Sequence, residues 1–164
     1  MNKEGHVLNA VVLSVGLGFL LEPAGTVETV RTIVAVTVPL SLGALFPDVD
    51  TAFGKHRKTL HNLPVLALFV AFPVVFSNLQ YVWIGVLTHY VLDYFGSRRG
   101  IALFYPLSST EYGFPSGVTT SSKFANAVTL VITAVELAAA AVIIYILPQY
   151  VDLPAMAELV SLVG

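Results

Sequence analysis

The sequence has no cysteine and few charged residues, with Asp, Glu, Lys and Arg making up 11% of its 164 residues. The absence of cysteine excludes disulfides and thiolate metal sites, so histidine nitrogen and carboxylate oxygen must hold any metal ion. The net charge of -2 indicates neither an acidic nor a basic partner. No face is basic enough to predict binding of duplex nucleic acid. The length fits one domain, which we take as residues 1–164.

Hydrophobic residues are in excess, at 56% of the chain with a mean hydropathy of +0.82. Long apolar runs are typical of membrane spans, which need roughly 20 residues each. The runs predict an all-α integral membrane bundle of about five transmembrane helices. We expect these helices over residues 7–21, 26–46, 63–76, 81–95 and 124–147. The third and fourth runs are short, which predicts a helical hairpin that is either two spans or one span with a re-entrant piece.

Two segments interrupt or follow this pattern. Residues 96–123 are rich in Ser, Thr and Gly, and predict a long irregular loop of the kind that is usually functional or disordered. Residues 148–164 predict a short amphipathic piece on the surface. Within the last span, Glu136 is either a functional buried acid or a protonated, hydrogen-bonded acid without a function of its own. We favour the second interpretation because no other polar residue is expected beside it.

The stretch from Phe46 to His61 gathers seven ionisable side chains between apolar flanks. They are Asp48, Asp50, Lys55, His56, Arg57, Lys58 and His61. This concentration predicts a metal site at the edge of a membrane. Either aspartate alone could instead cap a turn. The histidines are five residues apart, which does not fit the four-residue spacing of a zincin helix.

A second polar pair lies near the end of the fourth apolar run. His89 and Asp93 are four residues apart, so a helix places both on one face. This spacing suits two ligands of one metal ion, or one ligand and its supporting carboxylate. The alternative is a buried hydrogen bond between the two side chains. An ionisable pair inside a span indicates function.

Five spans place the amino end and the loops 46–62 and 96–123 on one side of the membrane. The basic residues on that side are Lys3, Lys55, Arg57, Lys58, Arg98, Arg99 and Lys123, and only Arg31 lies elsewhere. The positive-inside rule therefore predicts that this side is cytoplasmic. The same topology brings all four histidines, including His6, to the cytoplasmic edge.

Several short motifs occur together along the chain. They are Glu4-Gly5-His6, Pro47-Asp48-Val49-Asp50, His56-Arg57 followed by His61, and Thr88-His89 with Asp93, then Gly100 and Pro106. In this order they resemble the bacterial and archaeal family of inner-membrane, metal-dependent hydrolases related to YdjM. The resemblance covers residues 4 to 106, with departures at Phe46, Lys58 and Leu60. That family is thought to be distantly similar to zinc phospholipase C and related zinc nucleases, so the resemblance implies phosphoester hydrolysis by a zinc cluster.

These observations predict a membrane-bound, metal-dependent hydrolase that acts on a lipid headgroup or another phosphoester at the cytoplasmic face of the inner membrane. The expected ligands of two or more divalent ions, with zinc as the expected metal, are His6, Asp48, Asp50, His56, His61, His89 and Asp93. We expect Asp48 or Asp50 to accept a proton, and Arg57 and Arg98 to hold the phosphate. The 96–123 loop would close over the substrate.

Two other interpretations use the same side chains. A non-catalytic membrane protein could bind or transport a divalent metal, which requires a polar path across the bilayer. A structural protein could use the histidines and aspartates only as a hydrogen-bonded cap. The apolar runs offer little for a polar path except Glu136, so the transport hypothesis ranks second.

Overall fold

The computed structural model describes residues 3–76, 79–115 and 117–150, and within these it is helical, without a β-strand. The helices are α1 (Lys3–Leu21), α2 (Val27–Leu45), α3 (Leu63–Phe76), α4 (Val82–Phe95) and α5 (Ala125–Ala141). The α5 helix continues through a π-helical turn, Val142–Ile146, and a 3-10 turn, Leu147–Gln149. The predicted all-α class is confirmed. Most of the amphipathic piece expected at 148–164 lies outside the described residues.

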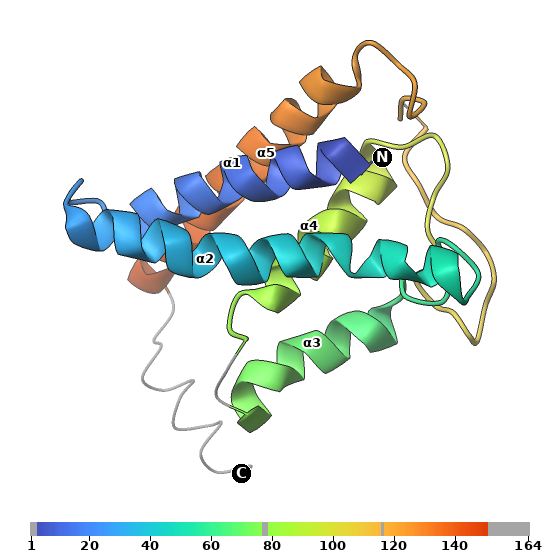
Figure 1. Ribbon diagram of the computed structural model, residues 1–164, viewed down its shortest axis with the longest axis horizontal. Coiled ribbons are helices and arrows are strands. Elements are labelled where there is room, and N and C mark those ends of the chain that lie inside the picture. Colours follow the sequence, from blue (N-terminus) through green and yellow to red (C-terminus); the bar gives the residue numbers. More distant parts are fainter. Residues whose placement is uncertain (1–2, 77–78, 116, 151–164) are drawn as a thin grey trace.

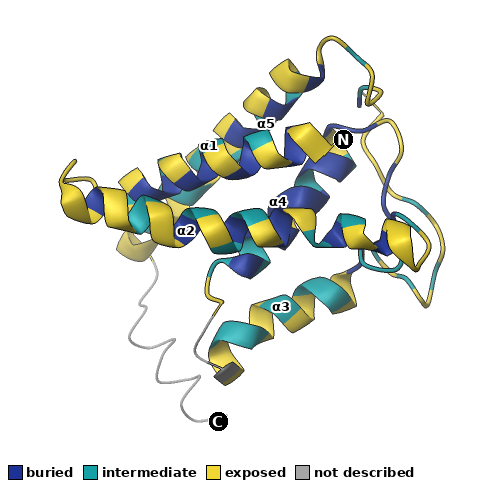
Figure 2. Cartoon of the chain, in the orientation of Figure 1, coloured by how far each residue is buried: buried dark blue, intermediate teal, exposed yellow. Residues whose placement is uncertain are grey.

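Three segments are long and apolar enough to cross a membrane, namely Lys3–Leu21, Val27–Ala52 and Ala125–Gln149. Helices α3 and α4 have 14 residues each. At 1.5 Å per residue each is about 21 Å long, shorter than a hydrocarbon core of about 30 Å. The outward faces of the helices are exposed (Figure 2). They carry large apolar side chains such as Val27, Val34 and Val135. This inverted pattern is that of a protein that sits in a lipid bilayer.

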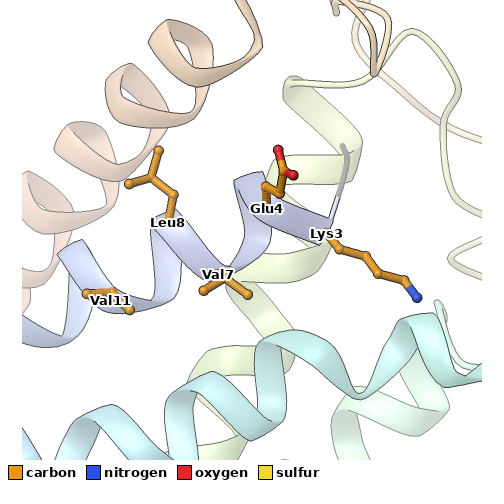
Figure 3. Close-up of a pocket in the computed structure, with 5 residues that line it drawn as sticks. All are labelled: Lys3, Glu4, Val7, Leu8 and Val11. Atoms are coloured by element: carbon orange, nitrogen blue, oxygen red, sulfur yellow. The ribbon is translucent and has the colours of Figure 1, made fainter.

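The first turn of α1 marks one edge of the apolar surface. A shallow hollow on its outer side is lined by Lys3, Glu4, Val7, Leu8 and Val11 (Figure 3). The two charged residues come first and the apolar ones follow, which is the sequence order expected where a helix enters the hydrocarbon core. The hollow is lined by α1 alone and contains no histidine, so it is not a candidate for the metal site.

Helix α2 ends where the candidate ligands begin. Pro47 starts a 3-10 turn, Pro47–Ala52, that follows α2 directly. Proline suits this first position because its missing N–H has no partner there in any case. The turn carries Asp48 and Asp50, and Asp50 is fully buried. The turn lies at the end of the bundle beyond α2 (Figure 1), so the local sequence brings two aspartates to that end.

Helices α2 and α4 touch through their backbones. A Cβ atom on Gly43 would overlap the carbonyl oxygen of Val82, and one on Gly85 would overlap that of Leu40. Small residues permit such approaches between membrane helices. A core of Ala10, Leu13, Leu17, Val36, Leu40 and Ala44 joins α2 to α1, and Ile84 of α4 packs against it. The close crossing brings the last turns of α4 against the end of α2.

Glu136 has polar neighbours, so the expectation that none accompanies it is wrong. Asn9 Nδ2 lies 2.7 Å from Glu136 Oε2 and 2.9 Å from Thr133 Oγ1. Thr88 Oγ1 lies 2.5 Å from Glu136 Oε1. Asn9 and Thr88 belong to α1 and α4, which are remote from Glu136 in the sequence, so an apolar run read by itself does not reveal them.

The crossing of α2 and α4 can be tested with alanine substitutions. Gly43→Ala is expected to lower the free energy of unfolding by about 1–3 kcal/mol, because the new methyl group meets backbone. Gly16→Ala is the matched control, since its Cβ would meet only the end of the Leu137 side chain. Thermal unfolding of the detergent-purified variants measures both. Equal stability of Gly43→Ala and wild type would contradict the close crossing.

Candidate metal centre

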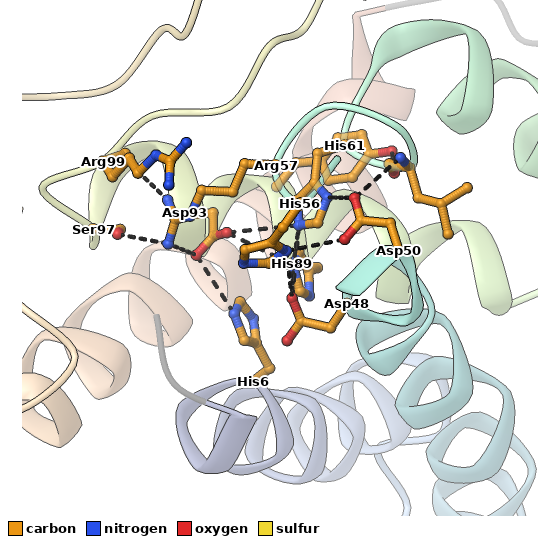
Figure 4. Close-up of polar contacts among 12 residues, drawn as sticks. His6, Asp48, Asp50, His56, Arg57, His61, His89, Asp93, Ser97 and Arg99 are labelled. Carbon is orange, nitrogen blue, oxygen red and sulfur yellow. Dashed lines mark hydrogen bonds and ion pairs between the residues drawn. The ribbon is translucent and has the colours of Figure 1, made fainter. Parts of the chain in front are cut away.

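Seven histidine and aspartate side chains meet at the end of the bundle where α1 begins and α2 and α4 end (Figure 4). They are His6 from α1, Asp48 and Asp50 from the turn after α2, His56 and His61 from the following loop, and His89 and Asp93 from α4. All but His56 and Asp48 are fully buried or nearly so. The sequence named these seven residues, and the structure brings them together.

Two histidine nitrogens face each other, and two carboxylate oxygens lie beside them. His61 Nε2 and His89 Nε2 are 3.0 Å apart. Asp48 Oδ1 lies 3.8 Å from His61 Nε2 and 3.7 Å from His89 Nε2. Asp93 Oδ2 lies 3.8 Å from each of the same two nitrogens. Each oxygen is therefore nearly equidistant from the two facing nitrogens.

The hydrogen-bond partners of the two imidazoles fix where their hydrogens lie. His61 Nδ1 is 3.0 Å from Asp50 Oδ2, and His89 Nδ1 is 2.6 Å from the carbonyl oxygen of Ala44. Both partners only accept, so each Nδ1 donates, and in the neutral rings each Nε2 is a bare lone pair. Burial lowers the pKa of His61, although Asp50 and Asp93 oppose this, so its ring is neutral at neutral pH. The two lone pairs then face each other and two carboxylate oxygens.

Such an arrangement of acceptors suits a cation. An ion with four ligands at about 2.0–2.1 Å in tetrahedral geometry holds its ligand atoms about 3.4 Å apart. The five measured separations, from 3.0 to 3.8 Å, bracket this value. Histidine nitrogens supported by a carboxylate or a carbonyl on their other nitrogen are typical of metal ligands. The donor set therefore fits a divalent metal ion.

His6 lies beside these atoms on the α1 side. Its ring stacks on that of His89 with 3.7 Å between ring centroids, and its Nε2 is 3.5 Å from Asp93 Oδ1. Neither of its ring nitrogens has a hydrogen-bond partner among the described residues, although both are buried. A buried polar atom without a partner is unfavourable, and a metal ion would satisfy one of these nitrogens.

The ligand atoms divide into two groups of three. His6, His89 and Asp93 form one group that could hold an ion, and Asp48, His56 and His61 form the other. Within each group the candidate atoms lie within 4.8 Å of one another. The 3.0 Å contact between His61 and His89 joins the groups, so together they make one continuous centre.

Asp50 supports the centre from behind. Its Oδ1 is 3.0 Å from His56 Nδ1, and its Oδ2 is 3.0 Å from His61 Nδ1. The same Oδ2 accepts a hydrogen bond of 3.3 Å from the backbone N–H of Leu60. Asp50 is outside both groups of candidate ligands. Its contacts are those of a residue that orients the two histidines rather than of one that is open to a substrate.

The structure separates the two arginines expected to bind phosphate. Arg57 is buried, and its guanidinium donates to Ser97 Oγ at 3.0 Å and to the carbonyl oxygen of Arg99. It also lies 3.6 Å from Asp93 Oδ1. These contacts tie the start of the 96–123 loop to the centre, and they use several of the N–H donors of the Arg57 guanidinium. Arg98 is exposed, and in the described part of the chain its side chain has no contact that joins it to the centre.

The 96–123 loop is folded against the centre and held by ion pairs. Ile101 and Tyr112 exchange backbone hydrogen bonds of 2.8 and 2.9 Å across the loop. Glu111 accepts two bonds from Arg99, at 2.8 and 2.9 Å, and lies 3.7 Å from Lys58 Nζ. The Arg99 guanidinium lowers the pKa of the Glu111 carboxyl, which stays ionised at neutral pH. The loop is therefore ordered where it meets the centre.

Sequence reasoning missed three groups that build the centre. Tyr90 donates to the carbonyl oxygen of Leu60 at 2.6 Å and accepts from the Asn62 N–H at 3.1 Å, which fixes the segment that carries His61. Ser97 binds Arg57, and the carbonyl of Ala44 binds His89. A tyrosine, a serine and a backbone carbonyl carry no spacing signal, so no pattern in the sequence pointed to them.

Comparisons with known proteins agree with the membrane setting. A family model described as YdjM inner membrane protein matches residues 1–156, nearly the whole chain. Searches of curated proteins and of solved structures found no match.

Metal content tests the centre directly. We expect His89→Ala to lose the metal ion, because it removes one of the two facing histidine nitrogens and one of the three candidate ligands in the group with His6 and Asp93. Asp50→Asn is expected to weaken metal affinity by about 10–100-fold without abolishing it, as for other residues that orient a ligand. Elemental analysis after dialysis against graded chelator concentrations measures both. Glu111→Gln is the control, since it removes an acid on the same edge that lies outside both groups. Equal metal content in wild type and His89→Ala would contradict the assignment.

Proposed function

The chain belongs to the YdjM inner membrane protein family, and we propose that it is a metal-dependent hydrolase that cleaves a phosphoester at the membrane surface. The observation that supports this most is the approach of His61 Nε2 and His89 Nε2 to 3.0 Å, with Asp48 Oδ1 and Asp93 Oδ2 each 3.7–3.8 Å from both nitrogens. Building such a centre costs stability unless a cation occupies it, so it is more than a cap on the bundle.

Zinc is the metal that we assign to the centre. The candidate atoms are nitrogens and carboxylate oxygens, which zinc accepts in tetrahedral sites. The two groups of three could each hold one ion, with His61 and His89 at their junction. A bound divalent ion supplies a lower pKa for an attacking water and polarisation of a phosphoryl oxygen, and a pair of ions suits the two oxygens of a phosphoryl displacement.

The protein side chains divide the remaining work among them. Asp48 is 13% exposed, whereas Asp50, His61 and His89 are 0% exposed, so Asp48 is the carboxylate that a substrate and water reach. We assign Asp48 as the acceptor of the proton of the attacking water. Asp50 keeps His56 and His61 oriented. Arg57 positions Asp93 and the start of the loop, and we assign Arg57 and Arg98 as the cations that hold the phosphate.

One observation favours metal transport, namely the polar cluster of Asn9, Thr88 and Glu136 inside the bundle. The hydrogen bonds of this cluster close on themselves. Asn9 Nδ2 donates to Glu136, and Thr88 Oγ1 lies within hydrogen-bonding distance of both Asn9 Oδ1 and Glu136 Oε1. These polar groups are already paired with one another, so they offer few free ligands to a cation that crosses the bundle. Hydrolysis is therefore the better-supported function.

The orientation that we propose places the centre in the cytoplasm. Seven of the eight basic residues lie at the end of the bundle with the centre or in its loops, and Arg31 lies on α2 toward the other end. The α3–α4 hairpin leaves and returns to the same end whether or not it crosses the bilayer fully. Both the arrangement with five spans and the one with a re-entrant hairpin therefore give the same orientation.

Turnover distinguishes the three functions. With zinc present, the purified protein is expected to hydrolyse p-nitrophenyl phosphate or a lipid phosphoester in mixed micelles, and His89→Ala is expected to fall to the uncatalysed rate. A transporter would instead lose zinc flux into proteoliposomes, and a structural cap would lose mainly thermal stability. Glu111→Gln should keep its activity. Absence of hydrolysis of both substrates by metal-loaded wild type would contradict the proposal.

The orientation can be tested because the chain has no cysteine. Lys55→Cys lies in an exposed position at the end with the centre, and Ala24→Cys lies in the exposed turn between α1 and α2 at the other end. In cells whose inner membrane is intact, a membrane-impermeant maleimide is expected to label Ala24→Cys at once and Lys55→Cys only after permeabilisation. Labelling in the reverse order would place the centre outside the cytoplasm.

A further inference from the structure

A cleft of about 430 Å³ lies between α1, α4 and α5, away from the metal centre. Its walls include Leu13, Leu17, Trp83, Leu87, Ala139 and Ile143. The volume falls in the range of small-molecule sites, about 300–1,000 Å³. Two of the three helices, α1 and α5, are candidate membrane spans, and the walls of the cleft are almost wholly apolar, so in a bilayer the cleft would open among lipid chains.

One end of this cleft is polar. Thr88 and Glu136 line it, and Asn9 lies behind them. Thr88 Oγ1 is 2.7 Å from Asn9 Oδ1 and 2.5 Å from Glu136 Oε1. One hydroxyl hydrogen cannot serve both acceptors. The pairs are all satisfied if Glu136 carries a proton and donates it to Thr88, which then donates to Asn9, while Asn9 Nδ2 donates back to Glu136 Oε2.

The closed ring leaves Glu136 neutral and only half-buried, so its oxygens retain acceptor capacity toward the cleft. A neutral group with free acceptors at one end of an apolar slot matches a hydroxyl group where a lipid chain meets its headgroup, because a hydroxyl can donate. A charged carboxylate would not, because an uncompensated charge at this depth is costly.

The polar end is also the end nearer the metal centre. Thr88 directly precedes His89 on α4, and Asn9 follows His6 by three residues on α1. From Thr88 the cleft runs back along α4 to Tyr81, which is about 10 Å at 1.5 Å per residue. A molecule whose chain filled the cleft would therefore carry its polar group on the side of the metal centre.

We infer that this cleft binds the acyl chain of a membrane lipid, with a hydroxyl group of the lipid donating at Thr88 and Glu136. The inference deepens the proposed function by naming a lipid phosphoester as the substrate class. It rests on that function only for the position of the headgroup. There are two competing outcomes. The cleft could be filled by a helix of a second copy of the chain, or by bulk lipid without preference.

Trp83 offers a direct test because it is the only tryptophan in the chain and it lines the cleft. The purified protein is placed in phosphatidylcholine vesicles that contain increasing fractions of a non-hydrolysable phosphonate analogue of lysophosphatidic acid, which carries a free glycerol hydroxyl and a dibrominated acyl chain. Bromine quenches tryptophan fluorescence on contact. A chain bound in the cleft is expected to give quenching that saturates at a low lipid fraction. Quenching that only rises in proportion to the brominated fraction, as for bulk lipid or a cleft closed by another copy, would overturn the inference.

Two neighbouring alanines provide matched variants. Ala139 lines the cleft and Ala138 does not, and both are exposed on α5. Ala139→Phe is expected to abolish the saturable quenching by filling the cleft, whereas Ala138→Phe is expected to retain it. Saturable quenching that is equal in the two variants would overturn the assignment of the cleft. Because both positions face outward, neither substitution should prevent folding.

The polar end has its own pair of variants. Glu136→Gln can still donate to Thr88 and accept from Asn9, so it is expected to bind the lipid as wild type does. Glu136→Leu removes the group and is expected to weaken binding, and thermal unfolding shows whether it folds. Loss of saturable quenching in a folded Glu136→Gln variant would contradict the neutral ring.

Binding and turnover fail separately in this design. Saturable quenching without hydrolysis by the metal-loaded protein would refute the proposed function and leave the lipid site standing. Hydrolysis of p-nitrophenyl phosphate without saturable quenching would refute the lipid site and leave the hydrolase standing.

Discussion

The structure depends on how the repulsion between lone pairs at its candidate metal centre is relieved. Two imidazole nitrogens face each other at 3.0 Å, with two carboxylate oxygens 3.7–3.8 Å away. In a site that is mostly buried, acceptors at these distances destabilise one another unless positive charge lies between them. A cation bound there would replace this repulsion with attraction. It would join α4 to the turn after α2 and to the loop that carries His61.

The rest of the fold can be understood as holding these atoms in place. Gly43 and Gly85 let α2 and α4 approach until the carbonyl of Ala44 reaches His89. Asp50 orients two histidines, and Arg57 ties Asp93 to the start of the long loop. These supports use backbone and side chains from segments that are separated by up to tens of residues. The cleft between α1, α4 and α5 extends from the neighbouring face of α4, so the candidate metal centre and the proposed lipid site share one helix.

Much of this could be predicted from the sequence. Apolar runs located all five helices, because length and hydrophobicity are local properties. The candidate ligands could be named because histidine and aspartate are rare in apolar segments, and the four-residue spacing of His89 and Asp93 fixes a shared helix face. What could not be predicted was the division of roles. The part played by Asp50 depends on where His56 and His61 turn, and Glu136 finds its partners on two other helices. Such contacts are properties of packing and leave no periodic trace.

X-ray absorption at the zinc edge of the purified, zinc-loaded protein identifies the atoms around the bound ion. We expect nitrogen and oxygen neighbours at about 2.0–2.1 Å with the multiple-scattering pattern of imidazole, because histidines supply ligands in both groups. A protein that retains no zinc after loading, or zinc surrounded by oxygen alone, would contradict this assignment of the centre.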